Sequence, residues 1–91
     1  MRTVYKYPIK LVDEQFISMP VDSEIIHVSL DPKGEPCIWA IVNTKARFSI
    51  NMPIYVRGTG HDLDGMHNNA KHVGSFKDRM FVWHVFAGSD N

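Results

Sequence analysis

The feature of this sequence that most limits its fold is a two-residue alternation of apolar and polar side chains, which recurs in short segments. Each segment has the length of a strand, is rich in β-branched or aromatic residues, and is closed by Pro, Gly, Asn or Asp. A helical period is weak throughout. The predicted strands are 3–10, 14–19, 24–30, 37–43, 47–57, 72–76 and 80–87. The sequence therefore predicts an all-β fold, a small antiparallel barrel or sandwich of six to seven strands.

Turn residues and prolines refine this prediction. Asp31-Pro32-Lys33-Gly34 predicts a hairpin between segments 24–30 and 37–43, because Pro presets φ and Gly accepts positive φ. Segment 37–43 is apolar on both faces, which is typical of a strand buried on both sides. Pro8 predicts an edge position for the first strand, because proline cannot donate to a ladder.

The segment 47–57 has the most regular alternation in the chain. Its even-numbered residues are apolar and are predicted to face the core, whereas the face that carries Tyr55 and Arg57 is predicted to meet water or a ligand. A polar loop is expected at 61–71 and a flexible tail at 88–91. A loop of this length in a small domain is usually functional or mobile.

Length and charge limit the partners of the chain. Its 91 residues predict a single domain, 1–91, whose small core favours a homo-oligomer. Ten basic residues balance ten acidic ones, so a nucleic acid polymer is not an expected partner. No segment has the length of a membrane span, and the single Cys37 excludes an internal disulfide, which favours the cytoplasm.

The candidate binding site lies where the segment 47–57 ends. Backbone amides of a Gly-x-Gly turn can form a nest that holds an anion, and neighbouring cationic side chains can add charge-assisted hydrogen bonds. A tight turn before a loop is the alternative interpretation. Tyrosines are suited to stacking against a nucleobase or to an interface with another chain. The expected ligand-binding residues are Arg57, Gly58, Thr59, Gly60 and His61, with Tyr55 or Tyr7 at the base.

Other reactive side chains are weaker candidates. The loop set His61, Asp62, Asp64, His67 and His72 contains metal-ligating residue types, but its spacing matches no defined metal motif. Cys37 lies on a predicted interior strand, where a free cysteine is usually inert. His84 is interpreted as a structural histidine. No catalytic residue, metal or cofactor is therefore expected, and the protein is predicted not to be an enzyme.

Seven stretches of the chain carry a family resemblance: Lys6-Tyr7-Pro8-Ile9, Met19-Pro20, Ile26-His27-Val28, Pro36–Val42, Tyr55–His61, His72–Phe76 and Phe81–Phe86. Together they resemble a family of short phage and prophage proteins with no assigned enzymatic activity. The resemblance covers nearly the whole chain, with a longer loop at 62–71 than in the shorter members. It implies a viral accessory protein in the host cytoplasm and supplies no mechanism.

Two functions follow as expectations. In the first, a non-catalytic phage protein binds and sequesters a small phosphorylated nucleotide that serves as a signal of host defence. In the second, the protein inhibits a host protein through an exposed edge strand or aromatic patch. A small metal-dependent phosphoesterase that uses His61, Asp62 or His72 is the enzymatic alternative.

Overall fold

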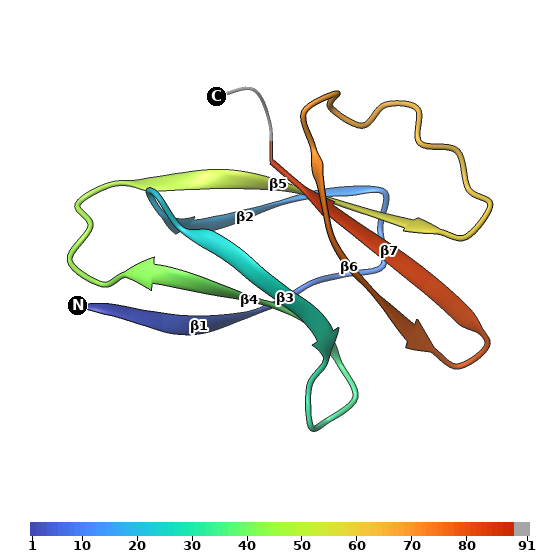
Figure 1. Ribbon diagram of the computed structural model, residues 1–91, viewed down its shortest axis with the longest axis horizontal. Coiled ribbons are helices and arrows are strands. Elements are labelled where there is room, and N and C mark those ends of the chain that lie inside the picture. The colour runs from blue at the N-terminus through green and yellow to red at the C-terminus, as the bar shows by residue number, and fades with distance from the viewer. Residues whose placement is uncertain (89–91) are drawn as a thin grey trace.

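The computed structural model describes residues 1–88 and shows seven antiparallel strands in two sheets (Figure 1). The sheets do not close on each other, so the all-β prediction is confirmed and the fold is a sandwich. None of the described residues forms a helix that could cross a membrane. The strands are β1 (Arg2–Pro8), β2 (Glu14–Pro20), β3 (Glu24–Leu30), β4 (Pro36–Asn43), β5 (Ser49–Gly58), β6 (Lys71–Asp78) and β7 (Phe81–Ala87).

The two sheets contain three and four strands. The smaller has the order β1-β4-β3 and the larger β2-β5-β7-β6. The β3–β4 hairpin forms as expected around its Asp-Pro-Lys-Gly turn, and β1 lies at an edge, as Pro8 predicts. The chain therefore changes sheet after β1, β2 and β4.

The core lies between the sheets. Ile38 of β4, Ile54 of β5 and Val85 of β7 belong to one buried cluster, and all three are 0% exposed. Burying such a side chain stabilises a fold by roughly 1.5–3 kcal/mol. On β4 the opposite face is covered at Cys37 but only partly at Trp39, so the prediction of burial on both sides holds at one end of that strand.

One side of the sandwich is tightly closed. The strands β3 and β6 pack against each other there, and a Cβ atom added to Gly74 would lie 2.9 Å from Cγ1 of Val28.

On the other side of the sandwich, the chain between the end of β1 and the start of β2 is held by Gln15. Its side-chain amide accepts a hydrogen bond from the backbone N–H of Lys10 (3.0 Å) and donates one to its carbonyl oxygen (2.8 Å).

The expectation for the outer face of β5 is wrong in its second half. Tyr55 and Arg57 point away from the core, yet they are 4% and 6% exposed. The chain that follows β5 returns over this face, where the carbonyl oxygens of Asp62 and Asp64 accept hydrogen bonds from Arg57. The predicted loop at 61–71 corresponds to the segment between Gly58 and Lys71. Of the predicted tail, 89–91 lie outside the described residues, and Gly88 donates its N–H to the carbonyl oxygen of Pro53 (3.0 Å).

Candidate functional site

The turn after β5 satisfies its own backbone amides. Gly58 donates its N–H to Nδ1 of His61 (3.1 Å), and His61 donates its N–H to the carbonyl oxygen of Gly58 (3.0 Å). Thr59 donates its N–H to the carbonyl oxygen of Val82 on β7 (3.2 Å), while Gly60 takes a φ of 86° that favours glycine. Three of the amides expected to hold an anion therefore already have acceptors within the protein.

Arg57 anchors the loop to the sheet. Its guanidinium donates to the backbone carbonyl oxygens of Asp62 (3.1 Å), Asp64 (3.4 Å), Val56 (3.2 Å) and Asp13. Asp13 precedes β2, so one side chain fixes two connections that are distant in the sequence. Arg57 was predicted to bind a ligand, but in this structure its guanidinium donates its hydrogen bonds to backbone carbonyl oxygens.

The two predicted tyrosines lie in different sheets. Tyr55 packs beside Arg57, whose guanidinium carbon is 5.9 Å from the ring centroid. Tyr7 lies on β1 in the other sheet, where its ring contacts Tyr5 edge-on at 6.4 Å between centroids. Partial burial raises the pKa of the Tyr7 hydroxyl above its usual value. The structure brings Tyr55 to Arg57 but does not bring Tyr7 to either residue.

An exposed row of hydroxyl and imidazole groups crosses the larger sheet beside this turn. Oγ1 of Thr59 lies 2.8 Å from Nε2 of His84, and Nδ1 of His84 lies 2.7 Å from Oγ of Ser75. Oγ of Ser75 is also 3.3 Å from Nε2 of His72. We call these four residues the hydroxyl–imidazole row. Of the predicted site residues, Thr59 contributes a side chain to it.

A β-bulge in β6 adds His72 to the row. Ser75 pairs with His84 and Gly74 with Val85, but the register shifts so that His72 pairs with Phe86. Without this shift, His72 would face the core and Val73 would face outward, because side chains alternate along a strand. The bulge therefore places His72 on the outer face beside His84, with 6.4 Å between their ring centroids.

The hydrogen bonds of the row can run in either of two directions, depending on the tautomer of His84. A neutral imidazole has one donor and one acceptor nitrogen, and a hydroxyl has one hydrogen to donate. If Ser75 donates to Nδ1 of His84, then Nε2 of His84 donates to Thr59 and the Thr59 hydroxyl keeps its hydrogen for an outside acceptor. The row then offers a hydrogen-bond donor to solvent at the strand end.

Two cationic side chains, Lys77 and Arg57, lie on the same face as the row. Lys77 follows Ser75 by two residues on β6, so it lies on the same face, and it is exposed. Arg57 pairs with His84 across β5 and β7, and its charge is buried next to the row. The one ion pair among residues 1–88 joins Lys6 to Asp31 in the other sheet, so no carboxylate neutralises Arg57 at ion-pair distance. This face therefore favours an anion.

The sequence analysis missed Ser75 and interpreted His84 only as a structural residue. The two-residue turn Arg79-Met80 could have predicted their contact. Pairing the residues of the two strands outward from this turn places Ser75 opposite His84. The bulge that adds His72 lies beside Gly74, and a glycine inside a strand marks either a bulge or a close backbone approach. The metal candidates of the loop do not gather: residues 1–88 contain no group of three or more His, Cys, Asp or Glu side chains placed to hold a metal ion.

Comparison with known families gives a match over the whole chain. The model of a domain of unknown function, DUF7352, matches residues 1–91. The chain belongs to this family. No curated protein and no solved structure shows significant similarity to the DUF7352 chain. The expected phage origin is not shown by this match and stays a prediction.

Proposed function

We propose that this DUF7352 protein is a non-catalytic binding protein for a small phosphorylated ligand, and that the ligand docks at the hydroxyl–imidazole row. The observation that carries the proposal is the exposed chain of hydrogen bonds from Thr59 through His84 and Ser75 to His72, beside the buried charge of Arg57. Hydroxyl and imidazole donors bind phosphoryl oxygens, and a positive potential strengthens such bonds.

The proposal shifts the ligand from the turn amides to the neighbouring side chains. The amides of Gly58, Thr59 and His61 have internal acceptors, so a phosphoryl group bound to them would have to break those bonds. The hydroxyls of Thr59 and Ser75 are exposed and can rotate toward a ligand without loss of a backbone bond. Nucleotides are the ligand class that we expect, as a phosphorylated signal of a host cell that the protein sequesters.

Calorimetric titration of the purified protein tests this function with inorganic phosphate, ADP-ribose and cyclic dinucleotides as probes. We expect binding of at least one nucleotide, weakened at least tenfold by Ser75→Ala or Thr59→Val, because a hydrogen bond to a charged group contributes about 1.5–3 kcal/mol. Thr44→Val is the matched control, since the Thr44 hydroxyl bonds the carbonyl oxygen of Met1 in the other sheet. Absence of binding across the panel, or unchanged affinity in Ser75→Ala, would overturn the proposal.

The same samples test the non-catalytic part of the proposal. Ser75 lies against His84 as a nucleophile lies against its base, so hydrolysis would be expected to start at this pair. We expect the nucleotide to be recovered intact after prolonged incubation, as followed by phosphorus NMR. Turnover that is lost in His84→Ala would make the protein an enzyme instead.

A second candidate function is binding to a host protein, and the β6–β7 hairpin favours it. The tip of this hairpin lies at the periphery of the molecule (Figure 1), where Met80 and Phe81 are 91% and 62% exposed. Exposed apolar residues at one place are typical of interaction surfaces. Met80→Ser together with Phe81→Ser should abolish capture of a specific host protein and leave nucleotide binding unchanged. Capture that persists in the double variant would exclude the hairpin tip.

A further inference from the structure

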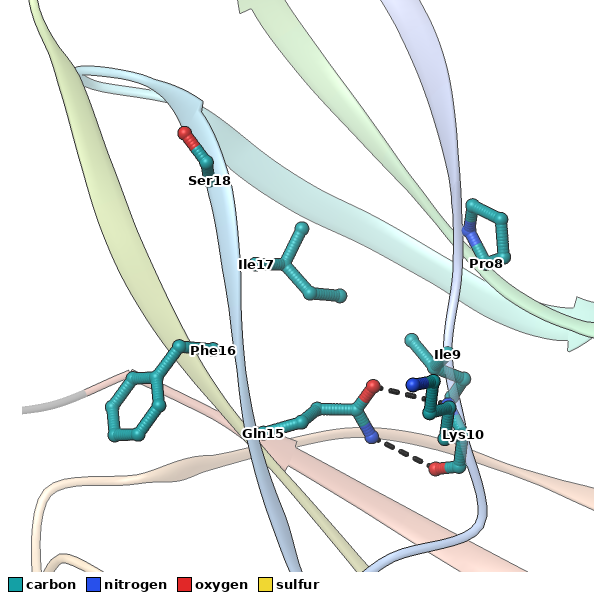
Figure 2. Close-up of a pocket in the computed structure, with 7 residues that line it drawn as sticks. All are labelled: Pro8, Ile9, Lys10, Gln15, Phe16, Ile17 and Ser18. Carbon is teal, nitrogen blue, oxygen red and sulfur yellow. Dashed lines mark hydrogen bonds between the residues drawn. The ribbon is translucent and has the colours of Figure 1, made fainter.

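The two sides of the sandwich, where edge strands of the two sheets lie next to each other, differ in how closely those strands pack. The order of strands leaves β1 and β3 at the edges of one sheet and β2 and β6 at the edges of the other. The strands β3 and β6 pack against each other, whereas a groove of about 420 Å³ lies along β1 and β2 (Figure 2). Ile9 and Ile17 line this groove, and Phe16 points away from it.

The hydrogen-bond register shows which residues of β1 face outward. Ile9 donates its N–H to Pro36, and Met1 accepts from Thr44, so odd-numbered residues of β1 bond to β4. In an antiparallel ladder the residues between them direct their backbone groups away from the partner strand. The outward residues of β1 are Arg2, Val4, Lys6 and Pro8. Charged residues and proline protect an edge from further pairing.

The same reasoning shows that β2 carries its outward charge and proline, Glu14 and Pro20, only at its two ends, so the middle of its edge is open. Val56 donates to Asp13, and Val21 donates to Phe48, so odd-numbered residues of β2 bond to β5. Pro53, which faces Phe16, directs its carbonyl toward the other neighbour and accepts from Gly88. The N–H and C=O groups of Phe16 and Ser18 therefore point away from the sheet, and no backbone group within residues 1–88 bonds them from outside the β2–β5 ladder.

We propose that this edge binds β2 of a second copy of the chain, in antiparallel pairing about a twofold axis at Ile17. In this register Phe16 exchanges backbone hydrogen bonds with the partner's Ser18, and Ser18 does so with the partner's Phe16. The two larger sheets then form one continuous sheet. This interface does not include the hydroxyl–imidazole row, so the dimer and the proposed ligand binding are tested separately.

Side-chain complementarity favours a second copy as the occupant. Ile17 faces the partner's Ile17 above the groove lined by Ile9, and Glu14 faces the partner's Pro20, so no like charges oppose each other. Lys10 lies beside Gln15, and Gln15 faces the partner's Met19 in this register. Lys10 of one copy and Lys10 of the other copy therefore lie at opposite ends of the interface. The net charge of zero leaves no long-range repulsion between copies.

Exposed apolar residues next to β2 extend the surface that dimerisation would cover. Phe16 is 61% exposed, and Leu11 and Val12, in the connection that leads to β2, are each 42% exposed. Removal of such side chains from water drives association. The half-buried Ile17 would complete its burial against the same residue of the partner.

Sedimentation velocity of the full chain from about 1 to 200 µM tests the proposal with an edge-blocking variant. We expect the native protein to be a dimer and Ser18→Pro to raise the dissociation constant at least 100-fold, because proline removes an outward N–H without loss of a ladder bond. Pro20 already occupies an equivalent position on β2. Val4→Pro on the outward side of β1 is the matched control and should remain dimeric. A native protein that is monomeric throughout overturns the proposal, as does a dimer unaffected by Ser18→Pro.

A second measurement applies if Ser18→Pro does not fold. The axis places Ile17 and the partner's Ile17 in a non-hydrogen-bonded pair, with a Cα separation of roughly 4.5 Å that suits a disulfide. Ile17→Cys should therefore form a covalent dimer under mild oxidation. Ser23→Cys, beyond the end of β2, should not. Equal cross-linking of both variants, or none in Ile17→Cys, overturns the register.

Discussion

At the scale of single residues, Arg57 shows how a side chain that resembles a ligand contact becomes a structural one. A cationic residue before a Gly-x-Gly turn is typical of an anion site. The guanidinium nevertheless meets carbonyl oxygens first, because the loop folds back over β5 and brings Asp62 and Asp64 within its reach. Local sequence carries no information about where a loop of this length returns, so this contact could not be predicted.

We expect Arg57→Met to destabilise the protein by about 3 kcal/mol, because buried carbonyl oxygens lose a charged donor and the loop loses its anchor. Denaturant unfolding measures this loss, and hydrogen exchange should show faster exchange in residues 61–70. Arg47→Met is the control, since Arg47 is exposed and should change stability by no more than ~0.5 kcal/mol. Equal unfolding midpoints for the two variants would contradict the anchoring role.

At the scale of elements, the sequence predicts the strands well because their determinants are local. Alternation and turn residues such as Asp31 and Gly34 act within a few positions, and the predicted strand ends lie within two residues of those observed. Bulges depend on packing between strands instead. The bulges after Ile25 and His72 were therefore not predicted, and the second of them determines which residues join the hydroxyl–imidazole row.

The turn between β3 and β4 gives a prediction about pH. Asp31 accepts hydrogen bonds from the N–H groups of Glu35 and Lys33 (both 2.9 Å) and from Nζ of Lys6 (3.1 Å). The Glu35 amide first, and then Lys6 and the Lys33 amide, hold the pKa of the Asp31 carboxyl below its usual 3.8, against the opposing effect of burial. Bonding to Asp31 likewise raises the pKa of Lys6 above 10.5.

A lowered pKa in the folded state means that Asp31 stabilises the fold above pH 3.8 and loses this contribution as pH falls through the folded value. We expect Asp31→Asn to be less stable at neutral pH and to show a flatter decline in stability below pH ~4. Lys6→Met should remove only the contribution of the ammonium group. The decline of its stability in acid should therefore be intermediate between those of the native protein and Asp31→Asn. Parallel pH profiles of the native protein and Asp31→Asn, measured by thermal unfolding, would contradict this account.

At the scale of the whole molecule, the contact between β3 and β6 decides how closely the two sheets approach. Gly74 faces Val28 without a Cβ atom, and the 2.9 Å that a Cβ would leave to Cγ1 is shorter than side chains accept. The branched side chain of Val28 is stiff at χ1, so it cannot turn away freely. A glycine in a strand often marks such a close approach.

We expect Gly74→Ala to lower the free energy of unfolding by about 1–3 kcal/mol through overpacking. Val28→Ala should destabilise as well, by opening a cavity, but the double variant should be more stable than the sum of the two losses. Denaturant unfolding of the four proteins closes this cycle. Strict additivity would show that the added methyl group is accommodated without pressing on Val28.

The order of strands has a consequence for synthesis of the chain. The sheet β1-β4-β3 is complete once residue 43 has left the ribosome, whereas β5 can pair with β7 only after residue 87 has been added. For the roughly 2–9 s needed to add residues 44–87 at about 5–20 residues per second, the nascent three-stranded sheet exposes the apolar face of Ile38, Ala40 and Val42. A chaperone acting on this protein during translation would find its binding surface there.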